Sequence, residues 1–133
     1  MKRCADIDPE RVILLGHSMG AGAAGSITSL RADRIAGVAL LAGFGGTPND
    51  RWPPAFVVAA GLDPLFPLAR MQASVERAQK AGARIAFLPY PHDGHTLVVT
   101  AALDEVVSRL LRASAEPRDR RSTAGSQGSL PPP

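Results

Sequence analysis

The chain has 133 residues, with 15 Lys and Arg against 12 Asp and Glu, which gives a formal net charge of +3. The basic side chains are scattered, apart from Arg118, Arg120 and Arg121, and no basic stripe is interleaved with aromatic residues, so we expect no nucleic-acid partner. The single cysteine, Cys4, excludes an intrachain disulfide, and it precedes the first predicted strand without a neighbouring base, which argues against a nucleophilic role. The longest apolar runs fall far short of the ~20 residues that a transmembrane helix needs, so no membrane span is predicted.

Apolar runs of strand length alternate along the chain with stretches of helical periodicity. The runs predict strands over residues 11–15, 35–43, 55–61 and 84–90, and the periodic stretches predict helices over residues 19–30, 68–81 and 96–112. This alternation favours an α/β fold with a parallel sheet of about four strands, flanking helices and right-handed crossovers. We expect residues 1–113 to form one domain. From residue 114 onward the composition is typical of a disordered tail.

The first predicted strand, expected to be buried on both faces, runs into the sequence Gly16-His17-Ser18-Met19-Gly20, which fits the pattern G-x-S-x-G. A strand before this pattern and a small-residue helix after it provide the setting in which the pattern carries a nucleophile. We expect a strained backbone at Ser18, and we expect a Cβ at either flanking glycine to collide with the neighbouring strand or helix. The backbone N–H of Met19 is the predicted oxyanion donor.

Three reactive side chains each follow a predicted strand. Ser18 follows the first strand, Asp63 the third and His95 the fourth. Because the carboxyl ends of parallel strands share one rim of the sheet, these side chains are expected to converge there. In that arrangement His95 takes the proton of the Ser18 hydroxyl, and Asp63 fixes the tautomer of His95 and stabilises its imidazolium form.

Simpler interpretations are open for each of these residues, and the G-x-S-x-G pattern around Ser18 by itself occurs by chance in many glycine-rich loops. An Asp before Pro, as in Asp63-Pro64, is commonly a turn former or a helix cap, and a loop histidine is often only solvated. His17 is expected to pack beside the turn around Ser18, and His92 is expected to be exposed.

Two other acids and a metal pair are weaker alternatives. Asp93 lies too close to His95 in the chain to orient it easily, and Asp104 is expected on a helix surface. A metal site built on His92 and His95 has no carboxylate or cysteine as a further ligand. We therefore expect neither a metal ion nor an organic cofactor.

Several motifs resemble those of the α/β-hydrolase superfamily, in its esterase, prolyl-oligopeptidase-like and dienelactone-hydrolase-like branches. They are the lead-in over residues 8–12, the Ser18 motif, the acid motif over residues 61–67 and Asp93-Gly94-His95, and the resemblance covers residues 8–112. It implies a serine hydrolase that cleaves carboxylic esters through an acyl-Ser18 intermediate, with Ser18, Asp63 and His95 as its triad. A serine peptidase or an acyltransferase uses the same atoms and stays open.

The resemblance is to the carboxyl half of that fold. In the superfamily a second oxyanion donor follows an earlier strand, and about half of the sheet precedes the Ser18 motif. A truncated, non-catalytic half that needs a partner is therefore a second hypothesis, with self-association or pairing along the edge of residues 11–15. The opening residues lack the apolar core of a signal peptide, so a cytoplasmic location is the default expectation.

The substrate is expected to be a small-molecule ester or acyl compound. The loop over residues 44–54 is too short for a helical lid, which favours small or exposed acyl groups over long lipids. Phe44, Trp52 and Phe66 either line an acyl or alcohol pocket or simply cover the sheet.

Overall fold

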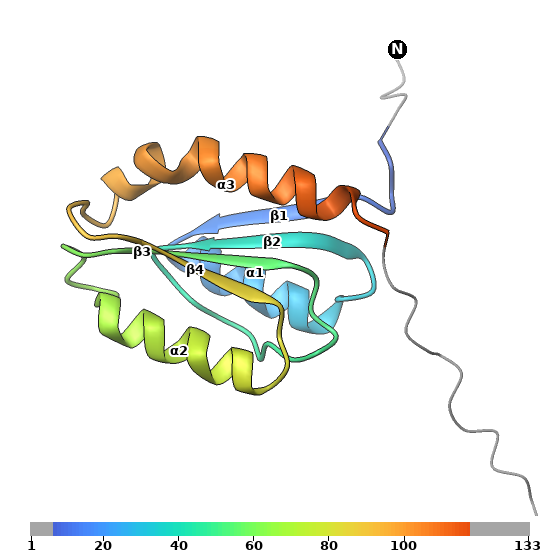
Figure 1. Cartoon of the computed structure of the whole chain (residues 1–133), viewed down its shortest axis with the longest axis horizontal. Coiled ribbons are helices and arrows are strands. Elements are labelled where there is room, and N and C mark those ends of the chain that lie inside the picture. The colour runs from blue at the N-terminus through green and yellow to red at the C-terminus, as the bar shows by residue number, and fades with distance from the viewer. Residues whose placement is uncertain (1–6, 118–133) are drawn as a thin grey trace, which may run out of the picture.

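A computed structural model of the chain describes residues 7–117, and Cys4, the three tail arginines and most of the predicted tail lie outside them. This part of the chain contains four strands and three helices (Figure 1). In chain order the elements are β1 (Val12–His17), α1 (Met19–Leu30), β2 (Ile35–Leu41), β3 (Ala55–Ala60), α2 (Leu68–Lys80), β4 (Ile85–Tyr90) and α3 (Leu97–Ala115). A helix follows every strand except β2, which a loop joins to β3. The predicted α/β class is confirmed.

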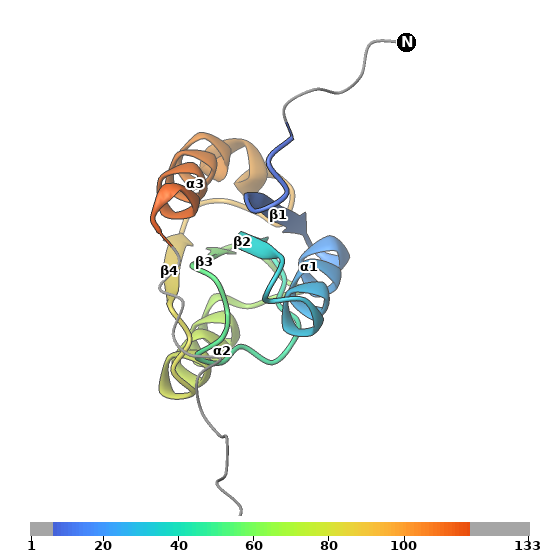
Figure 2. The same cartoon turned by 90° about the vertical axis from the view of Figure 1, so that its right-hand side faces the viewer.

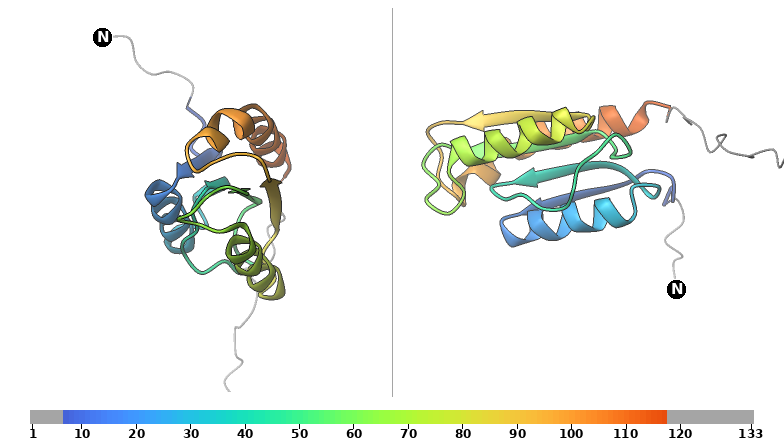
Figure 3. Two further views of the ribbon diagram at one scale, coloured as in Figure 1. Left: turned by 90° about the vertical axis from the view of Figure 1, so that its left-hand side faces the viewer. Right: turned by 90° about the horizontal axis from the view of Figure 1, so that it is seen from below.

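The four strands form one sheet in the order β1-β2-β3-β4, and every neighbouring pair is parallel. The crossovers β1-α1-β2 and β3-α2-β4 advance in the same direction, so right-handed connections place both helices on one face. Figures 1 and 2 show α1 and α2 on that face and α3 on the other, and in the right-hand view of Figure 3, taken from below, α1 and α2 both lie in front of the sheet.

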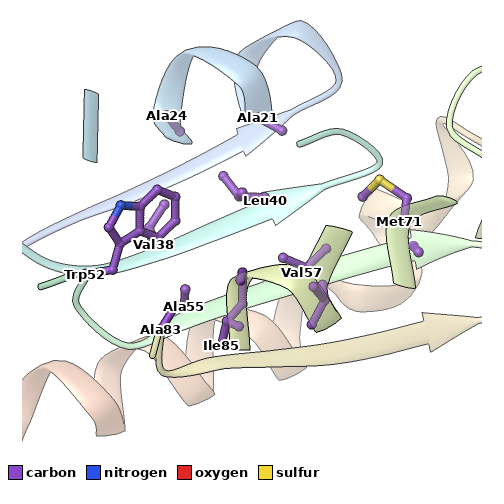
Figure 4. Close-up of a cluster of buried hydrophobic side chains, with 13 residues drawn as sticks. Ala21, Ala24, Val38, Leu40, Trp52, Ala55, Val57, Met71, Ala83 and Ile85 are labelled. Carbon is purple, nitrogen blue, oxygen red and sulfur yellow. The ribbon is translucent and has the colours of Figure 1, made fainter. Parts of the chain in front are cut away.

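Each face of the sheet has its own apolar core. Toward α1 and α2, Val38, Leu40 and Val57 pack with Met71 and Trp52 (Figure 4). Trp52 is 2% exposed, and its Nε1 donates to Ser29 Oγ at 3.2 Å, so this ring covers the sheet.

On the other face, α3 packs the residues Val98, Ala102, Val106 and Leu110 against β2 and β3. The helix is also tied to the edge strand β4, because the Tyr90 hydroxyl donates to Glu105 Oε2 at 2.6 Å. Burial, followed by the hydrogen bond to Glu105, raises the pKa of Tyr90 to about 12.

The structure corrects three details of the prediction. β1 does not end at its glycine: Gly16 and His17 stay paired with Leu40 and Leu41 of β2. It is also not buried on both faces, since Val12 and Leu15 are 38% and 40% exposed at the edge of the sheet. The last helix continues to Ala115, past the predicted start of the tail.

No helix among residues 7–117 combines the length and the apolar character that crossing a bilayer requires.

Candidate active site

Ser18 lies at the junction of β1 and α1 with a left-handed backbone, φ 55° and ψ −118°. A side chain in this region costs on the order of 1–3 kcal/mol, so surrounding contacts must hold it. The Ser18 N–H donates to the carbonyl of Leu41 at 2.9 Å, and the Ser18 carbonyl accepts from the N–H groups of Ala21 and Gly22. These bonds fix the turn from both sides, and the strained backbone expected at Ser18 is present.

The two glycines of the motif are not equivalent. A Cβ on Gly16 would lie 2.1 Å from the carbonyl oxygen of Gly20, so only glycine fits at the first position. A Cβ on Gly20 would meet no atom within 4 Å, so the predicted collision at this position is wrong. Gly43, which follows β2, has the steric role instead, since its Cβ would lie 2.4 Å from the carbonyl oxygen of Ser18.

Asp63 lies in the turn after β3, and its side chain is fully buried. Its Oδ1 accepts hydrogen bonds from the backbone N–H groups of Leu65 at 2.8 Å and Phe66 at 3.0 Å. Its Oδ2 lies 2.7 Å from Nδ1 of His95. The carboxylate therefore forms the turn, as the simpler interpretation held, and contacts the histidine as well.

These hydrogen bonds decide the ionisation of Asp63. Burial by itself raises the pKa of the carboxyl. The hydrogen bonds from the His95 ring and from the N–H groups of Phe66 and Leu65, with the charge of His95 when it is protonated, outweigh burial and lower the pKa below its ordinary 3.8. Asp63 is therefore ionised at neutral pH, as an orienting carboxylate must be.

His95, in the loop between β4 and α3, joins Asp63 to Ser18. Its Nε2 lies 2.9 Å from Ser18 Oγ, opposite the contact of Nδ1 with Asp63. An ionised carboxylate only accepts hydrogen bonds, so Nδ1 carries the proton and Nε2 of the neutral ring accepts from the hydroxyl. The structure thus brings together the three side chains singled out in the sequence, in an arrangement that can remove a proton from the serine.

Two further rings contact His95. His17 lies with its ring centroid 4.9 Å from that of His95, and its Nε2 is 2.7 Å from the backbone carbonyl oxygen of His95. Phe66 stacks nearly parallel to the His95 ring at 6.0 Å. His17 therefore packs beside the turn, as expected, but its hydrogen bond was not predicted. Of the three aromatic residues considered for a pocket, Phe66 stacks on His95, Trp52 belongs to the buried core, and Phe44 and Phe66 are both partly buried against that core.

The turn of Asp63 and the loop of His95 are joined through their backbones. The N–H of Gly61 donates to Tyr90 and that of Leu62 donates to Asp93, at 2.8 and 3.0 Å. A Cβ on Gly61 would lie 2.1 Å from the carbonyl oxygen of Pro91, so the two segments meet at van der Waals contact. A glycine directly after a buried strand was the available sequence signal for this approach.

The other candidates have different positions. His92 and Asp104 are exposed, as expected, and Asp93 contributes its backbone rather than its carboxylate to the histidine loop. Within residues 7–117 no group of three or more His, Cys, Asp or Glu side chains could hold a metal ion. Met19 is exposed in the first turn of α1, where backbone N–H groups lack intrahelical acceptors. Its N–H is thus available for the predicted oxyanion role.

A serine on a strand–turn–helix junction, hydrogen-bonded to a histidine that a buried carboxylate orients, defines a candidate nucleophilic site on a parallel α/β sheet. No protein-family model and no curated protein matches the chain.

Solved structures do match. Arabidopsis thaliana SOBER1 is similar with a TM-score of 0.68 and 22% identity, over 80% of this chain and 55% of that one. Zea mays acyl-protein thioesterase 2 is similar with a TM-score of 0.67 and 20% identity, over 85% and 59%. The Bacillus cereus carboxylesterase is similar with a TM-score of 0.63 and 18% identity, over 80% and 52%. At 18–22% identity these similarities show the fold alone, which matches part of an α/β-hydrolase fold as the sequence motifs predicted, and the chain spans about half the length of these structures.

The glycine contacts predict opposite outcomes for two alanine substitutions four residues apart. Gly16→Ala forces the backbone of Gly20 to move, so we expect a large loss of thermal stability or failure to fold. Gly20→Ala adds a methyl group in open space at the start of a helix, so we expect an unchanged or slightly higher melting temperature. Circular dichroism melts of both variants measure this. Equal destabilisation would contradict the assigned contacts.

The lowered pKa of Asp63 predicts a pH-dependent contribution to stability. The ionised carboxylate stabilises the fold fully above pH 3.8, and this contribution disappears as the pH falls through the lower pKa of the folded state. The difference in melting temperature between the wild type and Asp63→Asn should therefore be largest near neutral pH and shrink below about pH 3.8. Asp104→Asn, on the exposed surface of α3, is the control and should change the melting temperature little at any pH. A difference for Asp63→Asn that grows on acidification would refute the assignment.

Proposed function

We propose that the chain is a serine hydrolase that cleaves carboxylic esters through an acyl-Ser18 intermediate, without a metal or organic cofactor. The observation that carries the proposal is the hydrogen-bonded series Ser18 Oγ to His95 Nε2 at 2.9 Å and His95 Nδ1 to Asp63 Oδ2 at 2.7 Å. A serine hydroxyl is a weak nucleophile until a neighbouring base takes its proton, and this geometry supplies the base.

The proposed reaction follows from these contacts. Ser18 Oγ attacks the ester carbonyl carbon as its proton passes to Nε2 of His95, and Asp63 stabilises the imidazolium that forms. The N–H of Met19 donates to the developing oxyanion. When the carbon–oxygen bond to the alcohol breaks, His95 returns the proton to the leaving oxygen. Water, deprotonated by the same imidazole, then attacks the acyl carbon, and His95 returns that proton to Ser18 Oγ as the bond to the acyl group breaks and the acid is released.

Ester hydrolysis is favoured over peptide hydrolysis or acyl transfer to an acceptor other than water. The solved structures similar to this chain include an esterase, a carboxylesterase and an acyl-protein thioesterase. An ester carbonyl is also more electrophilic than an amide carbonyl, into which the nitrogen lone pair is delocalised, so the ester reaction asks less of the oxyanion site.

A fluorophosphonate probe, which phosphonylates activated serines, tests the proposal. The wild type should be labelled at Ser18, as peptide mass spectrometry can establish. Ser18→Ala should abolish labelling, and His95→Ala should slow it by about 10³-fold or more, because the base is lost. His92→Ala removes an exposed histidine three residues away and is the matched control, expected to react like the wild type. Labelling at another residue, or none in a folded sample, would refute the proposal.

A second candidate function is that of a half-domain that pairs along β1. In the described sheet β1 has β2 as its one neighbour, and it leaves Val12 and Leu15 partly exposed. Beside it, α1 exposes Ile27 and Leu30, which are 47% and 80% accessible. An unpaired strand edge with apolar side chains is a template for another strand, from a second copy or from another polypeptide. In this candidate a partner also supplies the second oxyanion donor, whose loss costs roughly 10²–10³ in rate.

Molar mass in solution distinguishes the two candidates. If β1 pairs between copies, light scattering after size exclusion should give a mass above the 13.9 kDa of one chain. Leu15→Lys should return it to 13.9 kDa, because a charge at the pairing edge disfavours strand addition. Leu111→Lys, on α3 and 51% exposed, is the control and should leave the mass unchanged. A monodisperse monomer with full esterase activity would eliminate the second candidate.

A further inference from the structure

We propose that His17 is a positioning residue that holds the imidazole of His95 over Ser18, an inference that rests on the hydrolase function proposed above. His17 Nε2 lies 2.7 Å from the backbone carbonyl oxygen of His95, 78 residues away in the chain. A carbonyl oxygen only accepts, so Nε2 of His17 is the donor. The adjacent rings, tilted by 46° with centroids 4.9 Å apart, add a packing contact to this bond.

The sheet order creates the need for such a contact. Ser18 follows β1 and His95 follows β4, which are opposite edges of the sheet. Three steps between neighbouring strands amount to roughly 14 Å, more than an imidazole side chain can span. The loop between β4 and α3 must therefore return across the strand ends and stay there.

The two ends of this crossing are held differently. Toward the acid, backbone bonds such as that from Leu62 N–H to Asp93 fix the loop to the turn of Asp63. Toward the nucleophile, the hydrogen bonds that join the loop to the β1–α1 turn in the described part of the chain are those of His95 with Ser18 Oγ and with His17. His17 thus supplies the connection that does not involve the reacting hydroxyl.

This distinction matters during the reaction. Once Ser18 Oγ is acylated, it has no proton to donate, and its hydrogen bond to Nε2 of His95 is lost. The bond from His17 to the His95 carbonyl involves no reacting atom and persists. It keeps Nε2 where the hydrolytic water must be deprotonated, so we expect deacylation to depend on His17 at least as strongly as acylation does.

Two amide substitutions that differ by one methylene group test this role. His17→Gln places an N–H donor at nearly the reach of Nε2, and His17→Asn falls short of the carbonyl oxygen of His95. With p-nitrophenyl acetate, His17→Asn should lower kcat by about 10²-fold with KM within about threefold, since misplacing a base affects the reaction more than binding. His17→Gln should recover most of this loss. His92→Asn is the matched control for removing a histidine.

A second measurement is independent of turnover. The Nδ1 proton of His95, held by the Asp63 carboxylate, should give a far-downfield proton NMR resonance that persists in His17→Gln and broadens or disappears in His17→Asn. If His17→Asn does not fold, His17→Phe, which keeps a ring without the donor, takes its place. A wild type that neither hydrolyses the ester nor reacts with the fluorophosphonate refutes the hydrolase function. In that case the NMR resonance of the two variants still tests whether His17 positions His95. Equal behaviour of the Gln and Asn variants in both measurements overturns the inference.

Discussion

The hydrogen bond between the buried carboxylate of Asp63 and Nδ1 of His95 is the interaction on which the rest of the site depends. Removing a carboxylate from water is costly unless hydrogen bonds replace its solvation. Two backbone N–H groups satisfy Oδ1, which leaves Oδ2 to the imidazole. This division fixes the tautomer of His95 and turns its basic nitrogen toward Ser18. The turn and the candidate site therefore depend on the same side chain, because Asp63 both closes the turn and orients the imidazole of His95.

The small residues of α1 have a related role in placing Ser18. The loop after β2 runs against the helix so closely that a Cβ on Gly25 would lie 2.2 Å from the carbonyl oxygen of Gly45, and a Cβ on Gly45 would lie 2.4 Å from that of Gly22. With Gly43 against the carbonyl of Ser18, this loop confines the first turns of the helix. Backbone contacts of this kind cannot relax by a change of rotamer. They can therefore hold a serine in a conformation that it would not adopt alone.

The sequence predicted the features of the fold and the site that follow from local residue patterns and from the order of the strands. Long apolar runs such as residues 35–41 must be buried on both faces, and the β2 strand is buried along its whole length. Because functional groups gather where parallel strands end, Ser18, Asp63 and His95 could be selected without a structure. The exposure of Leu15 was not predicted, because the same apolar run suits a central strand and an edge strand. The open space at Gly20 and the bond of His17 to a carbonyl 78 residues away depend on the final approach of distant segments, which local pattern does not encode.

The contacts also distinguish two parts of the proposed mechanism. Proton transfer from Ser18 depends on residues that hold one another in place, whereas oxyanion stabilisation needs a further donor. The strained turn at Ser18 is held by Leu41, Ala21 and Gly22, and Asp63 by its own turn. The three side chains of the proposed triad are thus placed by contacts within one sheet and its loops. Oxyanion stabilisation differs in the proposed mechanism, which assigns one donor to the Met19 N–H, whereas α/β-hydrolases take a second donor from a loop after an earlier strand. Proton transfer from Ser18 and stabilisation of the tetrahedral intermediate are therefore separable here. A site that is fully assembled for the first can react with an activated probe and yet turn over an ordinary ester slowly.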